Sequence, residues 1–346
     1  MKLTPLFALL GVACASTPAP VARRAPEPAP VVAVAPPPPP APPEPPPPAP
    51  PEPPPPAPPE QPEAPAASAE GVRMFRGRSE DEWVRLMHER PVERTVARFH
   101  STLYVFHMDL GDGVEISFQP EQRNLESFWR REIASYHLAR LLGIQHRVPP
   151  TIGKRVPLSA FGRLGRNTNL IVDREGMVYG SASVWMPVLH GAQMHEAPAR
   201  REWSGWMNPA NPVPEDRRER ARQVSEVLVF DYLAANYDRW NCCNITVDEN
   251  NDLVFRDNDA GWFPRGDQHA GLAGRRAPGA ALPLRVDAAR DPEALRASIA
   301  NDPMASRVHL IPDASFVGYE RRRNALIANL RRMVERHGEA AVFPWP

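Results

Sequence analysis

The amino-acid sequence predicts an α+β fold, with a sheet-rich first part and a mainly helical second part. Runs rich in β-branched and aromatic residues concentrate before residue 190, and long helical segments dominate after residue 215. Strand runs followed by helix runs are typical of α+β proteins, whereas α/β proteins alternate the two. Residues 71–346 are enough for one domain of two lobes with a sizeable core.

The first predicted elements surround a glycine turn. Leu103–Phe106 and Val114–Phe118 are β-rich and are joined by the turn Leu110–Gly113, so they predict a hairpin. A helix is expected from about Leu125 to Leu142, ended by Gly143. Further strands are expected at 171–172, 177–179 and 182–185.

The second part begins with a helix from about Asp216 to Ala235. Its segment Val227–Phe230 is apolar on all sides, so it is expected to be buried. Ile245–Val247 and Leu253–Phe255 flank a polar turn and predict a second hairpin. A strongly basic helix from about Tyr319 to His337 closes the chain.

Residues 1–15 predict a signal peptide. Lys2 precedes the apolar run Leu6–Ala13, which is too short to span a bilayer. In one interpretation Leu10–Cys14 is a lipobox, and a lipid on Cys14 anchors a bacterial lipoprotein to the membrane. In the other, cleavage at Ala13–Ala15 releases a secreted protein. Both place the protein outside the cytoplasm, either secreted or in the cell envelope.

Residues 16–70 predict a proline-rich, disordered linker. More than half of the 45 prolines lie here, and proline fixes φ and lacks a backbone N–H, so an extended chain is expected. A passive spacer is favoured, and a PxxP ligand for a partner domain is the alternative. Over the whole chain 41 basic residues balance 41 acidic ones, so no nucleic-acid partner recruited by net charge is expected.

Glu132 is hard to explain on the surface of its predicted helix. It shares the apolar stripe with Phe128 and Tyr136, and no cationic residue lies one helical turn away. A carboxylate that leans toward the core needs a partner from elsewhere. The alternative is a glutamate that reaches solvent at the edge of the stripe.

The segment 231–262 carries a second unusual set of polar residues. A buried helix delivers Asp238 into a loop with Asn244, and the second hairpin returns the chain to Asp257. These three side chains are expected to converge, one carboxylate accepting a proton while the other two groups hold Mg²⁺ or Mn²⁺. Phosphoryl transfer requires such a set, because metal and positioning neutralise the charge of the transferred group. Asp231 is expected to brace the loop structurally.

These residues resemble motifs of the secretory-pathway kinase family that includes the four-jointed box kinases and the Golgi casein kinase. The family segment D-x-x-x-x-N-x-D-R is matched by Asp231, Asn236, Asp238 and Arg239. The metal-binding D-N-x-(A/G)-x is matched by Asp257–Gly261. Upstream, the F-K-P, helix-glutamate and V-P-P motifs correspond to Phe118–Pro120, Arg131–Leu138 and Val148–Pro150. The resemblance covers roughly residues 110–263.

The resemblance implies a bilobal atypical protein-kinase-like fold, with an N-lobe over about residues 71–185 and a C-lobe over about 186–346. It implies phosphoryl transfer from ATP, with Mg²⁺ or Mn²⁺, to an unidentified protein or glycan hydroxyl. In this resemblance Asp238 is the catalytic base or the residue that orients the hydroxyl, and Glu132 is the helix glutamate. The other implied roles are metal ligands for Asn244 and Asp257, phosphate cover for Gly111 and Gly113, and hinge beside the adenine for Trp185 and Met186.

One departure from the family pattern bears on activity. The family lysine of F-K-P is Gln119 here, and a neutral amide supplies no charge to nucleotide phosphates. Arg123 is one candidate replacement, since arginine grips phosphate bidentately, and Arg130 and Lys154 are others. Otherwise the protein is a pseudokinase, a binding or regulatory module tethered to the envelope. A third hypothesis is a structural lipoprotein whose main feature is the linker.

Overall fold

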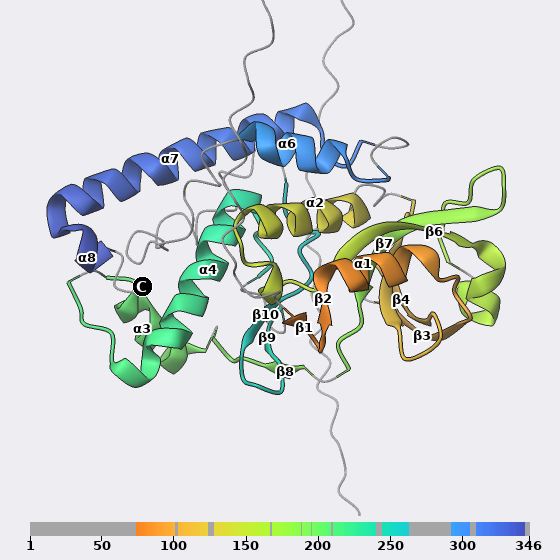
Figure 1. The fold of residues 1–346 in the computed structure, drawn as a ribbon, viewed down its shortest axis with the longest axis horizontal. Helices are drawn as coiled ribbons and strands as arrows, with labels where there is room; N and C mark the ends of the chain where they lie inside the picture. The colour runs from red at the N-terminus through yellow and green to blue at the C-terminus, as the bar shows by residue number, and fades with distance from the viewer. Residues whose placement is uncertain are drawn as a thin grey trace, which may run out of the picture. The chain divides into compact units, whose positions relative to one another are not determined.

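The computed structural model describes residues 74–100, 103–123, 128–166, 168–187, 189–194, 196–208, 210–239, 244–262, 292–304 and 309–342 (Figure 1). The predicted signal peptide, Cys14 and the proline-rich linker lie outside these residues. Within the described ranges, no helix combines the length and apolar character needed to cross a membrane.

A five-stranded antiparallel sheet dominates the first part of the chain. Its order is β3 (Arg94–His100), β4 (Tyr104–Asp109), β5 (Glu115–Pro120), β7 (Met177–Val184) and β6 (Thr151–Pro157). The predicted first hairpin is confirmed as β4–β5. Its turn contains Gly111 and Gly113, whose φ values of 83° and 71° are ones that glycine adopts without strain.

The two strands predicted on either side of Gly180 are a single strand, β7. A Cβ at Gly180 would lie 2.4 Å from the carbonyl oxygen of Gln119 and 2.7 Å from the Phe118 ring. This glycine therefore permits close approach of β5 and does not mark a turn. The prediction of a strand at 171–172 is wrong, because neighbouring Leu170 forms only an isolated bridge to Gln122.

The outer face of the sheet packs on a helix that the sequence pattern did not predict. Short strands β1 (Met74–Phe75) and β2 (Arg78–Ser79) precede α1 (Glu80–Glu89). The Ser79 side chain caps α1 by accepting from the Glu82 amide at 3.2 Å. The core here joins α1 to the sheet and includes Trp83, Leu86, Met87, Phe106, Ile116 and Phe118.

The predicted central helix is α2 (Phe128–Leu141), and its expected start at Leu125 lies outside the described residues. Helix α2 contacts β6 and β7 on one side and α4 and α6 on the other. Its buried residues belong to the large helical core, so α2 joins the sheet to the second part of the chain.

The second part is mainly helical. Its elements are β8 (His190–Gly191), α3 (Ala197–Trp206), α4 (Arg218–Ala234), β9 (Ile245–Val247), β10 (Leu253–Phe255), α6 (Pro292–Ala300), α7 (Asp313–His337) and α8 (Glu339–Val342), with 3-10 turns η1 (Gln145–Arg147), η2 (Leu158–Gly165) and η3 (Glu215–Arg217). The predicted buried helix is confirmed as α4 and the second hairpin as β9–β10.

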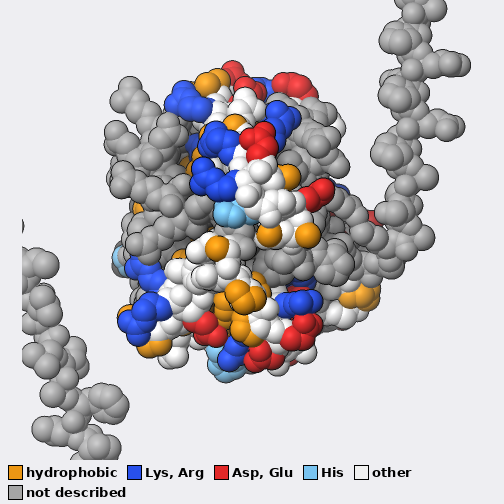
Figure 2. Space-filling view, turned by 90° about the vertical axis from the view of Figure 1, so that its left-hand side faces the viewer, with side chains coloured by type: hydrophobic (Ala, Val, Ile, Leu, Met, Phe, Trp, Pro, Cys, Tyr) orange, Lys and Arg blue, Asp and Glu red, His pale blue; other side chains and the backbone are white. Residues whose placement is uncertain are grey.

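The closing helix α7 begins at Asp313 and not at Tyr319, directly after Pro312. At the end of the molecule that Figure 2 shows, basic and acidic side chains are interspersed, in keeping with the balanced composition. The predicted α+β architecture, sheet-rich first and helical second, is confirmed.

Candidate active site

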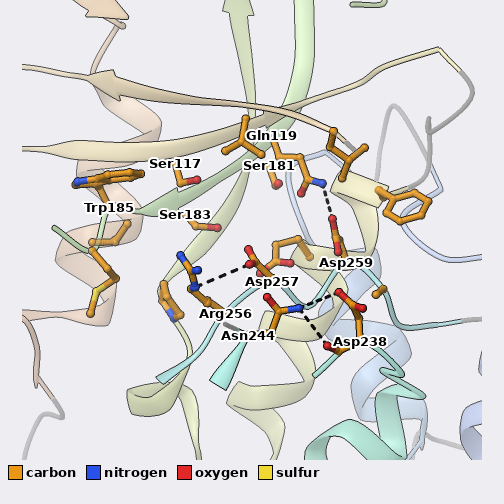
Figure 3. Close-up of a pocket in the computed structure, with 18 of the residues that line it drawn as sticks. Ser117, Gln119, Ser181, Ser183, Trp185, Asp238, Asn244, Arg256, Asp257 and Asp259 are labelled. Atoms are coloured by element: carbon orange, nitrogen blue, oxygen red, sulfur yellow. Dashed lines mark hydrogen bonds and ion pairs between the residues drawn. The ribbon is translucent and has the colours of Figure 1, made fainter. Parts of the chain in front are cut away.

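A cavity of about 420 Å³ is lined by the sheet, by α2 and by the loops after α4 and β10 (Figure 3). Strands β4, β5 and β7 form its roof, and Glu132 lines it from α2. Asp238 and Asn244 line it from the loop after α4, and Asp257 from the segment after β10. The four residues that the sequence singled out for chemistry therefore share one cavity.

Asp238 and Asn244 contact each other directly. The Asn244 side-chain amide donates to the Asp238 carboxylate at 2.8 Å and to its backbone carbonyl at 3.1 Å. These bonds use the amide nitrogen of Asn244 and orient its side chain. Asp257 is exposed to the cavity, and its φ of 54° is left-handed, which turns the chain sharply after β10.

The completely buried Arg239 holds these loops together. Its guanidinium binds Asp231 at 3.1–3.2 Å, the backbone carbonyls of Asn244 (3.0 Å) and Arg256, and the side-chain oxygen of Asn258. Burial raises the pKa of the Asp231 carboxyl to about 6, although Arg239 counteracts this, so the pair remains ionised at pH 7. The predicted bracing role of Asp231 is confirmed.

Glu132 is 8% exposed and takes its partner from the segment after β10, so the interpretation as a solvent-facing glutamate is wrong. One carboxylate oxygen accepts from the Asn258 backbone amide at 2.6 Å, and the other from the Asn258 side chain at 3.0 Å. Because Asn258 in turn accepts from Arg239, a continuous polar chain joins α2 to the loop after α4.

Carboxyl groups crowd the cavity. Burial, followed by the charges of Asp259 and Asp257, raises the pKa of Glu132 to about 8, while the hydrogen bonds from Asn258 lower it. Burial and Asp257 likewise raise the pKa of Asp259 to about 6. A divalent cation would relieve this repulsion, and the amide oxygen of Asn244 and the carboxylate of Asp257 are the hard ligands that Mg²⁺ and Mn²⁺ prefer.

Within the described ranges, no three or more His, Cys, Asp or Glu side chains are grouped so as to hold a metal ion. A cation beside Asn244 and Asp257 would therefore need further oxygen ligands. Mg²⁺ sites that use one or two carboxylates and complete their coordination with substrate phosphates and water follow this pattern. The residues present thus fit a cation that arrives with a phosphate ligand.

No protein-family model matches the chain. The human four-jointed box protein 1 is 31% identical over 160 residues, which cover 44% of this chain and 33% of that protein. The match thus spans about a third of the length of this relative.

The crystal structure of the Golgi casein kinase with Mn/ADP bound aligns with a TM-score of 0.55 at 18% identity, over 76% of this chain and 78% of that one. The chain has the Golgi casein kinase fold. The structure of hydra Fam20 with sugar aligns at a TM-score of 0.54 and 16% identity, over 75% and 90% of the two chains.

The resemblance to the four-jointed and Golgi casein kinase family is therefore confirmed. In this fold the sheet is the N-lobe and the helical part is the C-lobe. Trp185 and Met186 directly follow β7 and line the cavity, where a hinge residue is expected. The Trp185 indole stacks on His107, with ring centroids 4.0 Å apart.

Gln119 lies in the cavity roof, and its partner is not the helix glutamate. Its side-chain amide donates to Asp259 at 2.6 Å, across 140 positions of the chain. Asp259 is a cavity residue to which the sequence analysis gave no role, although it lies two positions after Asp257. The two side chains therefore belong to separate pairs, Gln119–Asp259 and Glu132–Asn258.

The structure does not bring Gly111 and Gly113 to the cavity, and their assignment to the phosphates stays a prediction. The strand register pairs Asp109 with Glu115 beside their turn, four residues from Gln119 along β5. Neither glycine lines the cavity. At the opposite end of β4 from this turn, His100 of β3 pairs with Tyr104, and this end is nearer Gln119. Residues 101–102, between β3 and β4, are outside the described ranges.

None of the proposed replacements for the lysine lines the cavity, and the assignment of Arg123 to nucleotide binding stays a prediction. The Arg123 side chain is exposed. Arg130 forms an ion pair with Glu121 at 2.5 Å. The Lys154 ammonium group is buried against backbone carbonyls near α1, to which it donates at 2.6 and 2.8 Å. Arg130 and Lys154 are thus committed to other partners, and Arg123 lies outside the cavity.

Lysine in place of Gln119 is expected to strengthen binding of ADP with Mn²⁺ about tenfold. The ammonium group adds a cation to a roof whose polar side chains are otherwise neutral, and a charge-assisted bond to phosphate is worth roughly 1.5 kcal/mol or more. Calorimetric titration of the full chain measures the change. Gln119→Met is the matched control for side-chain length, and equal affinity of the two variants would contradict the expectation.

Proposed function

We propose that this protein is an extracytoplasmic kinase-like protein that binds ATP with Mg²⁺ or Mn²⁺ and transfers phosphoryl groups to a protein or sugar hydroxyl. The observation that carries the proposal is the convergence of Asp238, Asn244, Asp257 and Glu132 in one interlobe cavity. The Mn/ADP bound to the Golgi casein kinase neighbour supports a nucleotide and a divalent cation as ligands.

Each polar residue of the site has a distinct role in this proposal. Asp238 orients the acceptor hydroxyl and takes its proton. Asn244 and Asp257 hold the cation, which when bound neutralises phosphate charge during transfer. The buried Arg239 and the Glu132–Asn258 pair fix the relative positions of α2 and the two loops, since each bonds more than one segment.

Transfer is expected to be slow, because Gln119 brings no charge to the phosphates. A misplacement of about 1 Å can cost on the order of 10²-fold in rate. The same residue favours a second candidate function, a pseudokinase that binds nucleotide and regulates a partner without turnover. Measurable phosphate transfer by the native protein separates the first function from the second.

Asparagine in place of Asp257 is expected to weaken binding of ADP with Mn²⁺ on the order of 100-fold, about 2.7 kcal/mol, because the cation loses its only charged ligand in this pair. The fold should be retained, and apo stability should hold or rise, since a repelling carboxylate is removed. Titration of the full chain with ADP, with and without a chelator, measures the metal-dependent affinity. Thermal unfolding of the protein without ligands measures the apo stability. Asp216→Asn, at an exposed position outside the cavity, is the control. An Asp257→Asn protein with wild-type affinity would end the metal assignment.

The location outside the cytoplasm is part of the same proposal, resting on residues 1–15 and on the secretory-pathway relatives. Lipidation of Cys14 should place the full chain in the membrane fraction. Cys14→Ser is expected to block processing or to release the protein, which fractionation and the mass of the mature N-terminus will show. Wild-type protein found in the cytoplasm with its first 13 residues retained would contradict the signal peptide.

A further inference from the structure

The charges that line the cavity are strongly unequal. Four carboxyl groups face it, from Glu132, Asp238, Asp257 and Asp259. Within the described part of the chain, Arg256 is the one lysine or arginine that lines it. A nucleotide phosphate entering this cavity meets repulsion from every ionised side chain except this guanidinium.

Arg256 is fixed at its backbone and faces the cavity with its side chain. It directly follows β10, and its carbonyl oxygen accepts from the buried Arg239. Its side chain is 40% exposed, and its Nε forms an ion pair with the Asp257 carboxylate at 3.8 Å. Figure 3 shows the guanidinium rising from the floor of the cavity toward the sheet.

Hydroxyl groups line the roof above this guanidinium. Ser117, Ser181 and Ser183 alternate with apolar residues of β5 and β7, so their side chains share the cavity face while the apolar ones pack against α1. Ser117 and Ser183 are direct cross-strand partners. Serine hydroxyls are small donors that leave room for a ligand and hydrogen-bond to anionic oxygens.

We propose that Arg256 is the phosphate-binding cation of this site and supplies the charge that Gln119 lacks. Its planar fork binds two oxygens of one phosphate, with the roof hydroxyls of Ser117 and Ser183 on the opposite side. The phosphates then lie between Arg256 and these hydroxyls, on the side of the cavity where Asp257 lies. This inference rests on the proposed nucleotide-binding function.

The test compares ligands with and without phosphate on the full chain. Arg256→Gln is expected to weaken binding of ADP with Mn²⁺ by about 10- to 100-fold and to leave adenosine binding within about twofold. Arg256→Lys should recover part of the lost ADP affinity. Arg331→Gln, at an exposed arginine of α7 outside the cavity, should bind both ligands like wild type. An unchanged Tm for each variant shows that the fold is retained.

Two results would overturn the role of Arg256 while leaving the proposed function intact. One is wild-type ADP affinity in Arg256→Gln, and the other is an equal loss of ADP and adenosine binding, which would show a general effect on the cavity. In both cases nucleotide binding by the wild-type protein leaves the proposed function standing. A wild-type protein that binds neither ligand overturns the proposed function and this inference with it.

Discussion

Asparagine in place of Asp238 is expected to lower the rate of phosphoryl transfer by about 10²- to 10⁴-fold, the usual range for loss of a positioned general base. The carboxylate lines the cavity and is oriented by the Asn244 amide at 2.8 Å. Asparagine keeps the size and can still accept that bond through its oxygen, but it takes up no proton. Phosphate release from ATP with Mn²⁺ measures the rate without a known acceptor.

The control for this variant is nucleotide affinity. Because Asp238 is assigned to the acceptor hydroxyl and not to the cation, Asp238→Asn should bind ADP with Mn²⁺ within about threefold of wild type. An active wild-type protein whose Asp238→Asn variant keeps its rate would remove Asp238 from the chemistry. A variant that loses binding as completely as Asp257→Asn would reassign it to the cation.

Methionine in place of Arg239 is expected to destabilise the fold by about 3–5 kcal/mol, because Asp231 would be left as an uncompensated buried charge. Neither side chain has exposed surface. For a domain of this size the Tm should fall by roughly 10 °C. Chemical denaturation and calorimetry of the full chain measure the two quantities.

A double variant isolates the ion pair from the other bonds of Arg239. Arg239→Met combined with Asp231→Leu removes both charges, so it should cost less than Arg239→Met alone. The loss of unfolding free energy that remains in the double variant measures the other hydrogen bonds of Arg239. These go to the carbonyls of Asn244 and Arg256 and to the Asn258 side chain. A loss below about 1 kcal/mol in Arg239→Met would contradict the central role of this side chain.

The features that the sequence predicted are those set by local pattern. The hairpins β4–β5 and β9–β10 follow from alternation around short turns, and α4 follows from a continuous apolar run. Asp238, Asn244 and Asp257 could be placed together because one short hairpin separates them. The need of Glu132 for a distant partner followed from its helix face alone.

The features that the sequence did not predict depend on distant or atypical contacts. The partner of Glu132 lies 126 positions away and that of Gln119 lies 140 positions away, so no local spacing indicates them. Strand β3 has exposed apolar residues at Val96 and Phe99, which obscure its alternation. Without β3, the pairing of β3 with β4 could not be predicted.

A crystal structure of the full chain with ADP and Mn²⁺ would show whether the interlobe cavity holds the cation and the nucleotide. The anomalous signal of manganese locates the cation without assumptions about the surrounding density. We expect one manganese peak coordinated by Asp257 and Asn244, with the ADP phosphates between this peak and Arg256. Manganese and nucleotide bound outside the interlobe cavity, or a cavity that stays empty at saturating ADP, would contradict it.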